Sequence, residues 1–321
     1  MGQQRTFAEL AWTQKGKVTK RERFLSEMNR VIPWTELTAL IEPHYPKGER
    51  GRPTLGIEKM LRIYFLQQWF DLSDPLAEES LYDSESMRRF VGIELSEDVV
   101  PDESSILRFR HLLESHRLTE AIFTAVRQLL ESRGILLKTG TIVDATILTA
   151  PSSTKNATGT RDPEMASTKK GTTYHFGMKV HVGTDRHGLV HSVATTDAAS
   201  ADVQQLPDLV HGEERALYGD RAYWSEGDRQ ACQSAGIAYR VNRRSSKWTP
   251  LTRRWHAINR ARSRIRARSE YAFRVVKHLW GFRKVRYRGL AKNTARVFAI
   301  FALANLYLAR RRLRPAGATC L

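Results

Sequence analysis

Residues 141–148 read TIVDATIL, a run of β-branched and apolar residues that contains a single charge, Asp144. β-branched residues favour strands, and the helical spacing found upstream ends at this point. The run therefore predicts a buried strand. Because an unpaired charge in an apolar strand costs on the order of several kcal/mol, Asp144 is expected to pair with a cation or to bind a metal ion.

Strand-like and helix-like segments alternate after this strand. Further strands are predicted at Tyr174–Gly183, Leu189–Thr195, Arg215–Gly219 and Ile237–Val241, and helices at 201–210, Trp224–Ala235 and about 256–280. The turn sequence Asp185–Gly188 joins the first two of these strands into a hairpin. A hairpin followed by alternating strands and helices predicts an α/β fold, an RNase H-like mixed sheet flanked by helices, over residues 140–314.

Residues 57–139 form a predicted helical domain. Asp74-Pro75 and Pro101-Asp102 are typical helix starts. The short helices form either a DNA-binding helix-turn-helix, in which Arg108, Arg110 and His111 face DNA, or a plain packing domain. Residues 1–56 form an N-terminal arm rich in turns. Its basic residues mark either a solvated tail or a DNA contact, and they are Lys15, Lys17, Lys20, Arg21 and Arg23.

The charge of the chain is uneven. The net charge is +18, and residues 240–321 hold 23 of the 52 lysines and arginines but only one acid, Glu270. The last quarter is therefore +22 and the rest is −4. A segment with so large an excess of basic over acidic residues predicts a phosphate-binding surface, with nucleic acid as the partner.

Other classes of protein find less support. Cys232 and Cys320 suit neither a zinc site nor a disulfide framework, the N-terminus lacks the apolar core of a signal peptide, and the longest apolar stretch, 297–309, is broken by Asn305. We therefore expect a cytoplasmic protein without a membrane span. No P-loop or GxGxxG motif is present, and four histidines without a cysteine are weak support for zinc: His175, His181, His187 and His191.

Two further carboxylates are candidates for chemistry with Asp144. Asp220 follows a short predicted strand, and strand ends are where α/β proteins build sites. Glu270 shares one face of the 256–280 helix with Ser263, Arg266, Arg274 and Lys277, opposite an apolar stripe of Ile258, Ile265, Ala272, Val276 and Leu279. It is either part of an ion-pair ladder or a metal ligand. Carboxylates that converge on Mg²⁺ are the usual means of attacking a phosphodiester.

The motifs resemble those of bacterial insertion-sequence transposases of the DDE type, the insertion-sequence-five group. The similar segments are Thr141–Thr146, Ala150–Asn156, Arg161–Met165, Phe176–Lys179, Gly219–Tyr223, Gly281–Asn293 and Pro101–Ser105. Arg266, Glu270 and Lys277 match the last three positions of the family's Tyr-Arg-Glu-Lys motif. Ser263 departs from it, because it stands where the family has tyrosine.

The resemblance implies that Asp144, Asp220 and Glu270 bind two Mg²⁺ ions, with Mn²⁺ as a substitute. It implies a homodimer on paired DNA ends, with the element's terminal inverted repeats and target DNA as substrates. Arg266 and Lys277 are the implied contacts to the DNA end. The other candidate DNA contacts are Arg274, Lys179, Arg283, Lys284, Arg286, Arg288, Arg108 and Arg110. Tyr223 and Trp224 either stack on an unpaired base or, with more support, pack in the core.

Two alternatives remain open at this point. A non-catalytic DNA-binding protein explains the basic block but leaves the acid in TIVDATIL unexplained. A nuclease with the same metal site explains both features, and it differs from a transposase in that it joins no DNA ends.

Overall fold

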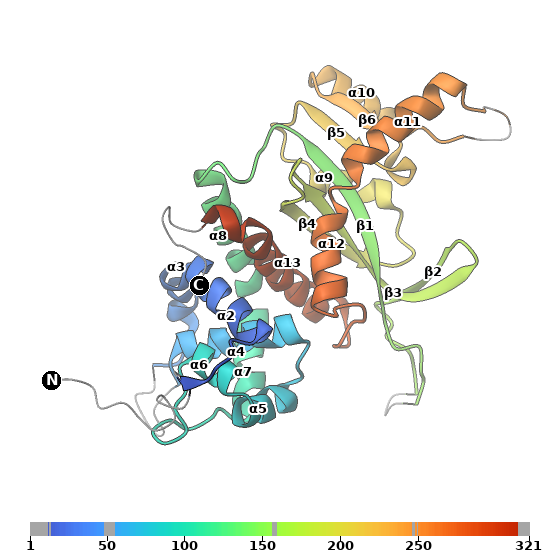
Figure 1. The fold of residues 1–321 in the computed structure, drawn as a ribbon. Helices are drawn as coiled ribbons and strands as arrows, with labels where there is room; N and C mark the ends of the chain where they lie inside the picture. Colours follow the sequence, from blue (N-terminus) through green and yellow to red (C-terminus); the bar gives the residue numbers. More distant parts are fainter. Residues whose placement is uncertain are drawn as a thin grey trace.

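The computed structural model describes residues 14–47, 55–155, 159–245 and 250–313, with the single residues 12 and 248. Two residues named in the sequence analysis, Asn156 and Cys320, lie outside these ranges. Residue 314, the expected end of the second domain, also lies outside them. Figure 1 shows a group of helices from residues 20–132 beside a mixed sheet built from residues 141–241.

The sheet has six strands in the part of the chain that is described. Its order is β2-β3-β1-β5-β6, and β4 also pairs with β3. β1 pairs antiparallel with β3 and parallel with β5, and β5 pairs parallel with β6. The strands are β1 (Thr141–Thr149), β2 (Ala166–Lys170), β3 (Thr173–Thr184), β4 (Val190–Asp197), β5 (Ala216–Gly219) and β6 (Ala238–Val241). This order confirms the predicted α/β, RNase H-like sheet, and it adds β2, which the sequence analysis did not include.

The position of β1 in the sheet explains its composition. Val143 is fully buried against the small core on one face of the sheet, and Leu148 is buried in the large core on the other face. Branched apolar residues suit a strand that is covered on both faces. Asp144 lies opposite Val182 in the β1–β3 register, so a carboxylate is held at the centre of the sheet.

Helices occupy most of the first 132 residues. They are α2 (Lys20–Val31), α3 (Trp34–Ile41), η1 (Glu42–His44), α4 (Ile57–Phe70), α5 (Asp74–Asp83), α6 (Glu85–Val91), α7 (Glu103–Ser115) and α8 (Leu118–Ser132). α7 starts at Pro101-Asp102 as predicted, with the Asp102 side chain as its cap. The side chain that caps α5 belongs to Ser73, one residue before Asp74, which the sequence indicated as the cap. The turn-rich arm expected over residues 1–56 is wrong for residues 20–44. These residues are helical because Leu25, Met28 and Leu37 supply a buried face.

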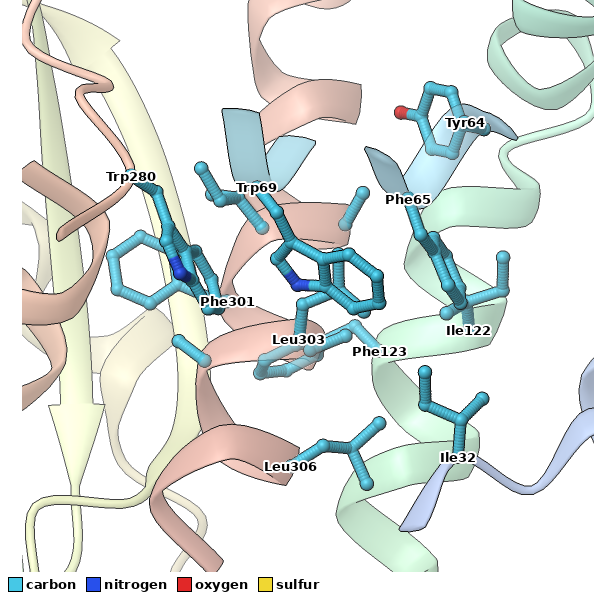
Figure 2. Packing of buried hydrophobic residues seen from close by; sticks show 14 of the residues in the cluster. Ile32, Tyr64, Phe65, Trp69, Ile122, Phe123, Trp280, Phe301, Leu303 and Leu306 are labelled. Atoms are coloured by element: carbon cyan, nitrogen blue, oxygen red, sulfur yellow. The ribbon is translucent and has the colours of Figure 1, made fainter. Parts of the chain in front are cut away.

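The last helix, α13 (Leu290–Leu313), lies between the helical part and the sheet and packs against both (Figure 1). Figure 2 shows the core around it, where Trp69, Phe123 and Phe301 come together from α4, α8 and α13. Asn305 interrupts its apolar sequence for a structural reason. Its side-chain amide accepts a hydrogen bond from Val190 N (2.8 Å) and donates one to Val190 O (2.6 Å) at the start of β4. The core is therefore continuous across the domain boundary expected at residue 139.

The segments between β4 and α13 complete the fold. They comprise η2 (Asp202–Gln205), α9 (Leu206–Leu209), η3 (Arg221–Tyr223), α10 (Glu226–Ser234), α11 (Arg253–Arg266), α12 (Glu270–Arg274) and the π-helical turn η4 (Val275–Leu279). The single helix predicted over about 256–280 is thus interrupted between residues 266 and 270. Leu279, expected in its apolar stripe, is 57% exposed. No described helix is long and apolar enough to cross a membrane.

Candidate functional site

A cleft of about 1060 Å³ lies where β1, the end of β5, and α12 meet. Asp144, Asp220 and Glu270 all line it. Asp144 comes from the middle of β1, Asp220 follows the last residue of β5, and Glu270 is the first residue of α12. Folding thus brings to one cleft three carboxylates that are 76 and 50 positions apart in the sequence.

Asp144 is the most enclosed of the three, with 9% of its surface exposed. Its carboxylate accepts hydrogen bonds from Ser269 Oγ (2.8 Å) and pairs with Arg266 Nη1 (3.2 Å). Burial raises the pKa of the Asp144 carboxyl, although the Arg266 charge and the Ser269 hydroxyl act in the opposite direction. The expected requirement for a cationic partner is therefore met by Arg266.

The turn after β5 sets the position of Asp220. Gly219 has no room for a side chain, because a Cβ atom there would lie 2.9 Å from Val143 Cγ2. The Asp220 carboxylate accepts a hydrogen bond from Ala222 N (2.8 Å) and so caps η3. Its charge is close enough to Asp144 to contribute to the raised pKa of that carboxyl.

The break before α12 determines how Glu270 is presented. The chain turns at residues 267–269, where Ser269 is fully buried, and Glu270 emerges exposed at the cleft. Arg266, Glu270, Arg274 and Lys277 line one cleft despite the break, as their shared face in the sequence predicted. Ser269, the residue that joins the break to Asp144, was missed, because helical spacing carries no signal for it.

The donor set suits a hard divalent cation. Mg²⁺ prefers carboxylate oxygens and is often held by one or two carboxylates together with water and substrate phosphates. Among the described residues, no three acidic, histidine or cysteine side chains lie close enough together to hold one ion as they stand. Two neighbouring carboxylates of the cleft, with water and substrate phosphates as the remaining ligands, would provide the oxygen coordination that Mg²⁺ prefers. A cation at Asp144 requires the Arg266 guanidinium to move aside.

Cations surround the acids in the cleft. Arg274 is exposed there, and Lys277 Nζ donates to Thr146 Oγ1 and Ile147 O, each at 2.6 Å. Burial, aided by the nearby cations, lowers the pKa of Lys277 to about 8. Lys179 also lines the cleft, but its ammonium pairs with Asp202 (2.9 Å).

The other basic candidates divide into exposed and internal groups. Arg283, Lys284, Arg288 and Arg108 are exposed. Two expectations need correction, because Arg110 and Arg286 are committed to contacts inside the protein. Arg110 is 6% exposed and pairs with Asp74 (3.0 Å) and Glu114 (2.9 Å). Arg286 pairs with Asp71 (2.9 Å) and ties the loop before α13 to the end of α4.

The floor of the cleft contains Tyr223, whose side chain is fully buried and whose hydroxyl lies 3.3 Å from His181 Nδ1. Core packing is thus its role here. Burial lowers the pKa of His181 to about 4, and this residue also contacts Thr196 Oγ1 (3.0 Å). Ser263, at the departure from the family motif, accepts a hydrogen bond from Asn242 Nδ2 (3.0 Å).

Two family models match the chain. The model described as "Transposase DDE domain" matches residues 136–306, and the model described as "Transposase domain (DUF772)" matches residues 13–112. The first match spans more than half of the chain and includes all three cleft carboxylates, and the second covers most of the helical part. No solved structure gave a significant match.

Proposed function

Because this chain belongs to the family of DDE transposases, we propose that it moves its own insertion sequence. It binds the terminal inverted repeats, cleaves the DNA at the element ends, and joins the freed 3′ hydroxyl groups to target DNA. The observation that carries this proposal is the single cleft in which Asp144, Asp220 and Glu270 lie among cations. Membership of the insertion-sequence-five group is part of the same proposal.

The carboxylates and the cations of the cleft have separate roles in this proposal. Asp144, Asp220 and Glu270 would hold two Mg²⁺ ions, with Mn²⁺ as a substitute. Ions held there would supply activation of the attacking water or hydroxyl and stabilisation of the leaving oxygen. Lys277 and Arg274 neutralise the DNA backbone where it enters the cleft. Ser269 Oγ, by donating to one oxygen of Asp144, fixes the orientation of that carboxylate.

The remaining features of the proposal concern partners. The substrate is double-stranded DNA, both the element ends and the target, and a homodimer holds two ends together. The +22 charge of residues 240–321 supports a large DNA contact. We place the protein with the bacterial nucleoid in the cytoplasm, where this DNA is found. Exposed arginines and lysines beyond the cleft extend the contact, namely Arg283, Lys284, Arg288 and Arg108.

The test uses duplexes that carry the inverted repeats flanking the gene. Asp144→Asn, Asp220→Asn and Glu270→Gln should each abolish Mg²⁺-dependent cleavage while the protein still binds the duplex. Asp208→Asn, a change of an exposed acid outside the cleft, serves as the matched control and should cleave normally. Chelation of the metal with EDTA should act like the three cleft variants.

The outcomes separate the alternatives. Wild-type protein that binds the duplex but never cleaves it would indicate a non-catalytic DNA-binding protein. Cleavage without joined products, tested with precut ends and a target plasmid, would indicate a nuclease. Normal cleavage by Asp144→Asn would refute the proposed site itself.

A further inference from the structure

A second, smaller cavity of about 340 Å³ adjoins the main cleft. Asp220 and Arg266 line both spaces, so the two are immediate neighbours. The cavity lies at the carboxyl ends of the parallel strands β5 and β6, where Asn242 N donates to Gly219 O (3.1 Å). In α/β sheets this edge is a usual place for ligands.

The lining of the cavity is cationic. Arg221, Arg243 and Arg266 contribute three guanidinium groups, His256 adds an imidazole, and Asp220 is its one acid. Within the described residues neither Arg221 nor Arg243 forms an ion pair. The guanidinium of Arg243 instead lies over the Trp255 ring, 3.9 Å from its centroid. Such a lining favours an anion.

Two buried polar atoms at the cavity lack a hydrogen-bond partner among the described residues: Arg266 Nε and Asn242 Oδ1. Buried polar groups are almost always satisfied, so each exception calls for an explanation. Arg266 Nε is a donor that suits an anion directly. The Asn242 side chain also suits an anion if its amide group is rotated by 180°, which exchanges Oδ1 and Nδ2. In that orientation the Ser263 hydroxyl donates to Oδ1 as readily as it now accepts from Nδ2.

We propose that this cavity binds a backbone phosphate of the DNA strand whose neighbouring phosphodiester occupies the main cleft. The assignment rests on the proposed function, because it takes the bound strand to pass Asp220. Arg221 and Arg243 contact the phosphate oxygens, and Arg266, which lies between the two spaces, contacts the same strand. Ser263 is compatible with this role, because its hydrogen bond with the Asn242 side chain keeps that side chain beside the cavity.

The test measures how duplex binding depends on salt, in the absence of divalent metal so that no DNA is cut. The logarithm of the binding constant falls with the logarithm of salt concentration in proportion to the number of phosphates contacted, by about 0.9 per phosphate. Arg221→Gln should reduce the magnitude of the slope by about 0.9. The Arg221 side chain is exposed and forms no hydrogen bond or ion pair with a described residue, so the variant should fold. Arg243→Gln is a second variant with the same expectation.

Arg229→Gln is the matched control, since Arg229 lies on α10, pairs with Glu226 and does not line this cavity. Its slope should equal that of the wild type. An unchanged slope in both cavity variants would overturn the proposal, as would an equal change in the control. If inorganic phosphate weakens wild-type DNA binding more than chloride at equal ionic strength, while the cavity variants keep the wild-type slope, the cavity is a site for free anions and the proposal is wrong.

Failure here is distinguishable from failure of the proposed function. A wild-type protein that binds and cleaves the element ends, with cavity variants whose slopes do not change, refutes the phosphate site alone. A wild-type protein that binds no duplex refutes both.

Discussion

If Lys277 contacts DNA as proposed, DNA binding should depend on pH. The pKa of Lys277 in the free protein is about 8, against 10.5 for an ordinary lysine, so the side chain loses its charge near the upper end of the physiological range. If only the charged form contacts a DNA phosphate, the binding constant follows the protonated fraction. That fraction falls about tenfold between pH 7 and pH 9, and the dissociation constant should rise about tenfold.

The assay is fluorescence anisotropy with a labelled duplex at low salt, from pH 7 to pH 9 and without divalent metal. Lys277→Arg should bind with a nearly constant affinity over this range, because a guanidinium stays charged. Lys292→Met changes an exposed lysine on α13 and should keep the wild-type pH dependence. The pH dependence of the free energy of unfolding, measured without DNA, provides an independent test of the lowered pKa of Lys277. Because the folded-state pKa is depressed, this group adds stability as pH rises from about 8 towards 10.5.

Stability and DNA binding should therefore change in opposite directions over the same pH range. A tenfold loss of affinity that persists unchanged in Lys277→Arg would refute the reasoning, because another group would then be responsible for it.

Three further predictions concern packing and the metal site. Asn305→Leu leaves two buried backbone groups of β4 without partners, so the free energy of unfolding should fall by about 2–6 kcal/mol in a urea titration. As a control, Leu306→Met should change the free energy of unfolding by less than about 1.5 kcal/mol. A loss under about 1 kcal/mol for Asn305→Leu would contradict this role of Asn305. Gly177→Ala places a Cβ atom 2.0 Å from a carbonyl oxygen of β1, so it should lower the thermal midpoint of unfolding, and an unchanged midpoint would argue against this packing. Arg266→Gln removes the cation paired with Asp144 and should tighten Mn²⁺ binding about tenfold or more in a calorimetric titration, since like charges repel; equal or weaker binding would count against competition between this arginine and the metal.

Most strands of the sheet, and the positions of Asp144 and Asp220 in it, were predictable because their signals are local. The run 141–148 has one buried charge among branched residues, and Asp220 comes at a strand end, so residue type and position in the element together mark both acids. The shared face of Arg266, Glu270 and Lys277 also follows from spacing alone.

Features set by long-range contacts were not predictable in this way. At the break between α11 and α12, Ser269 donates a hydrogen bond to Asp144, which lies 125 positions away in the sequence. The internal roles of Arg110 and Arg286 depend on Asp74 and Asp71, acids that lie 36 and 215 positions from them. β2 reads ASTKK, which has no apolar alternation, so only its pairing with β3 reveals it.

The position of α13 has a consequence for how the protein is made. This helix contributes buried side chains to the core shared by the helical part and the sheet, yet it is translated after everything it packs against. A ribosome must therefore release residues 290–313 before that core closes. A translation product that stops before residue 290 would leave uncovered the apolar side chains that α13 buries in the full chain.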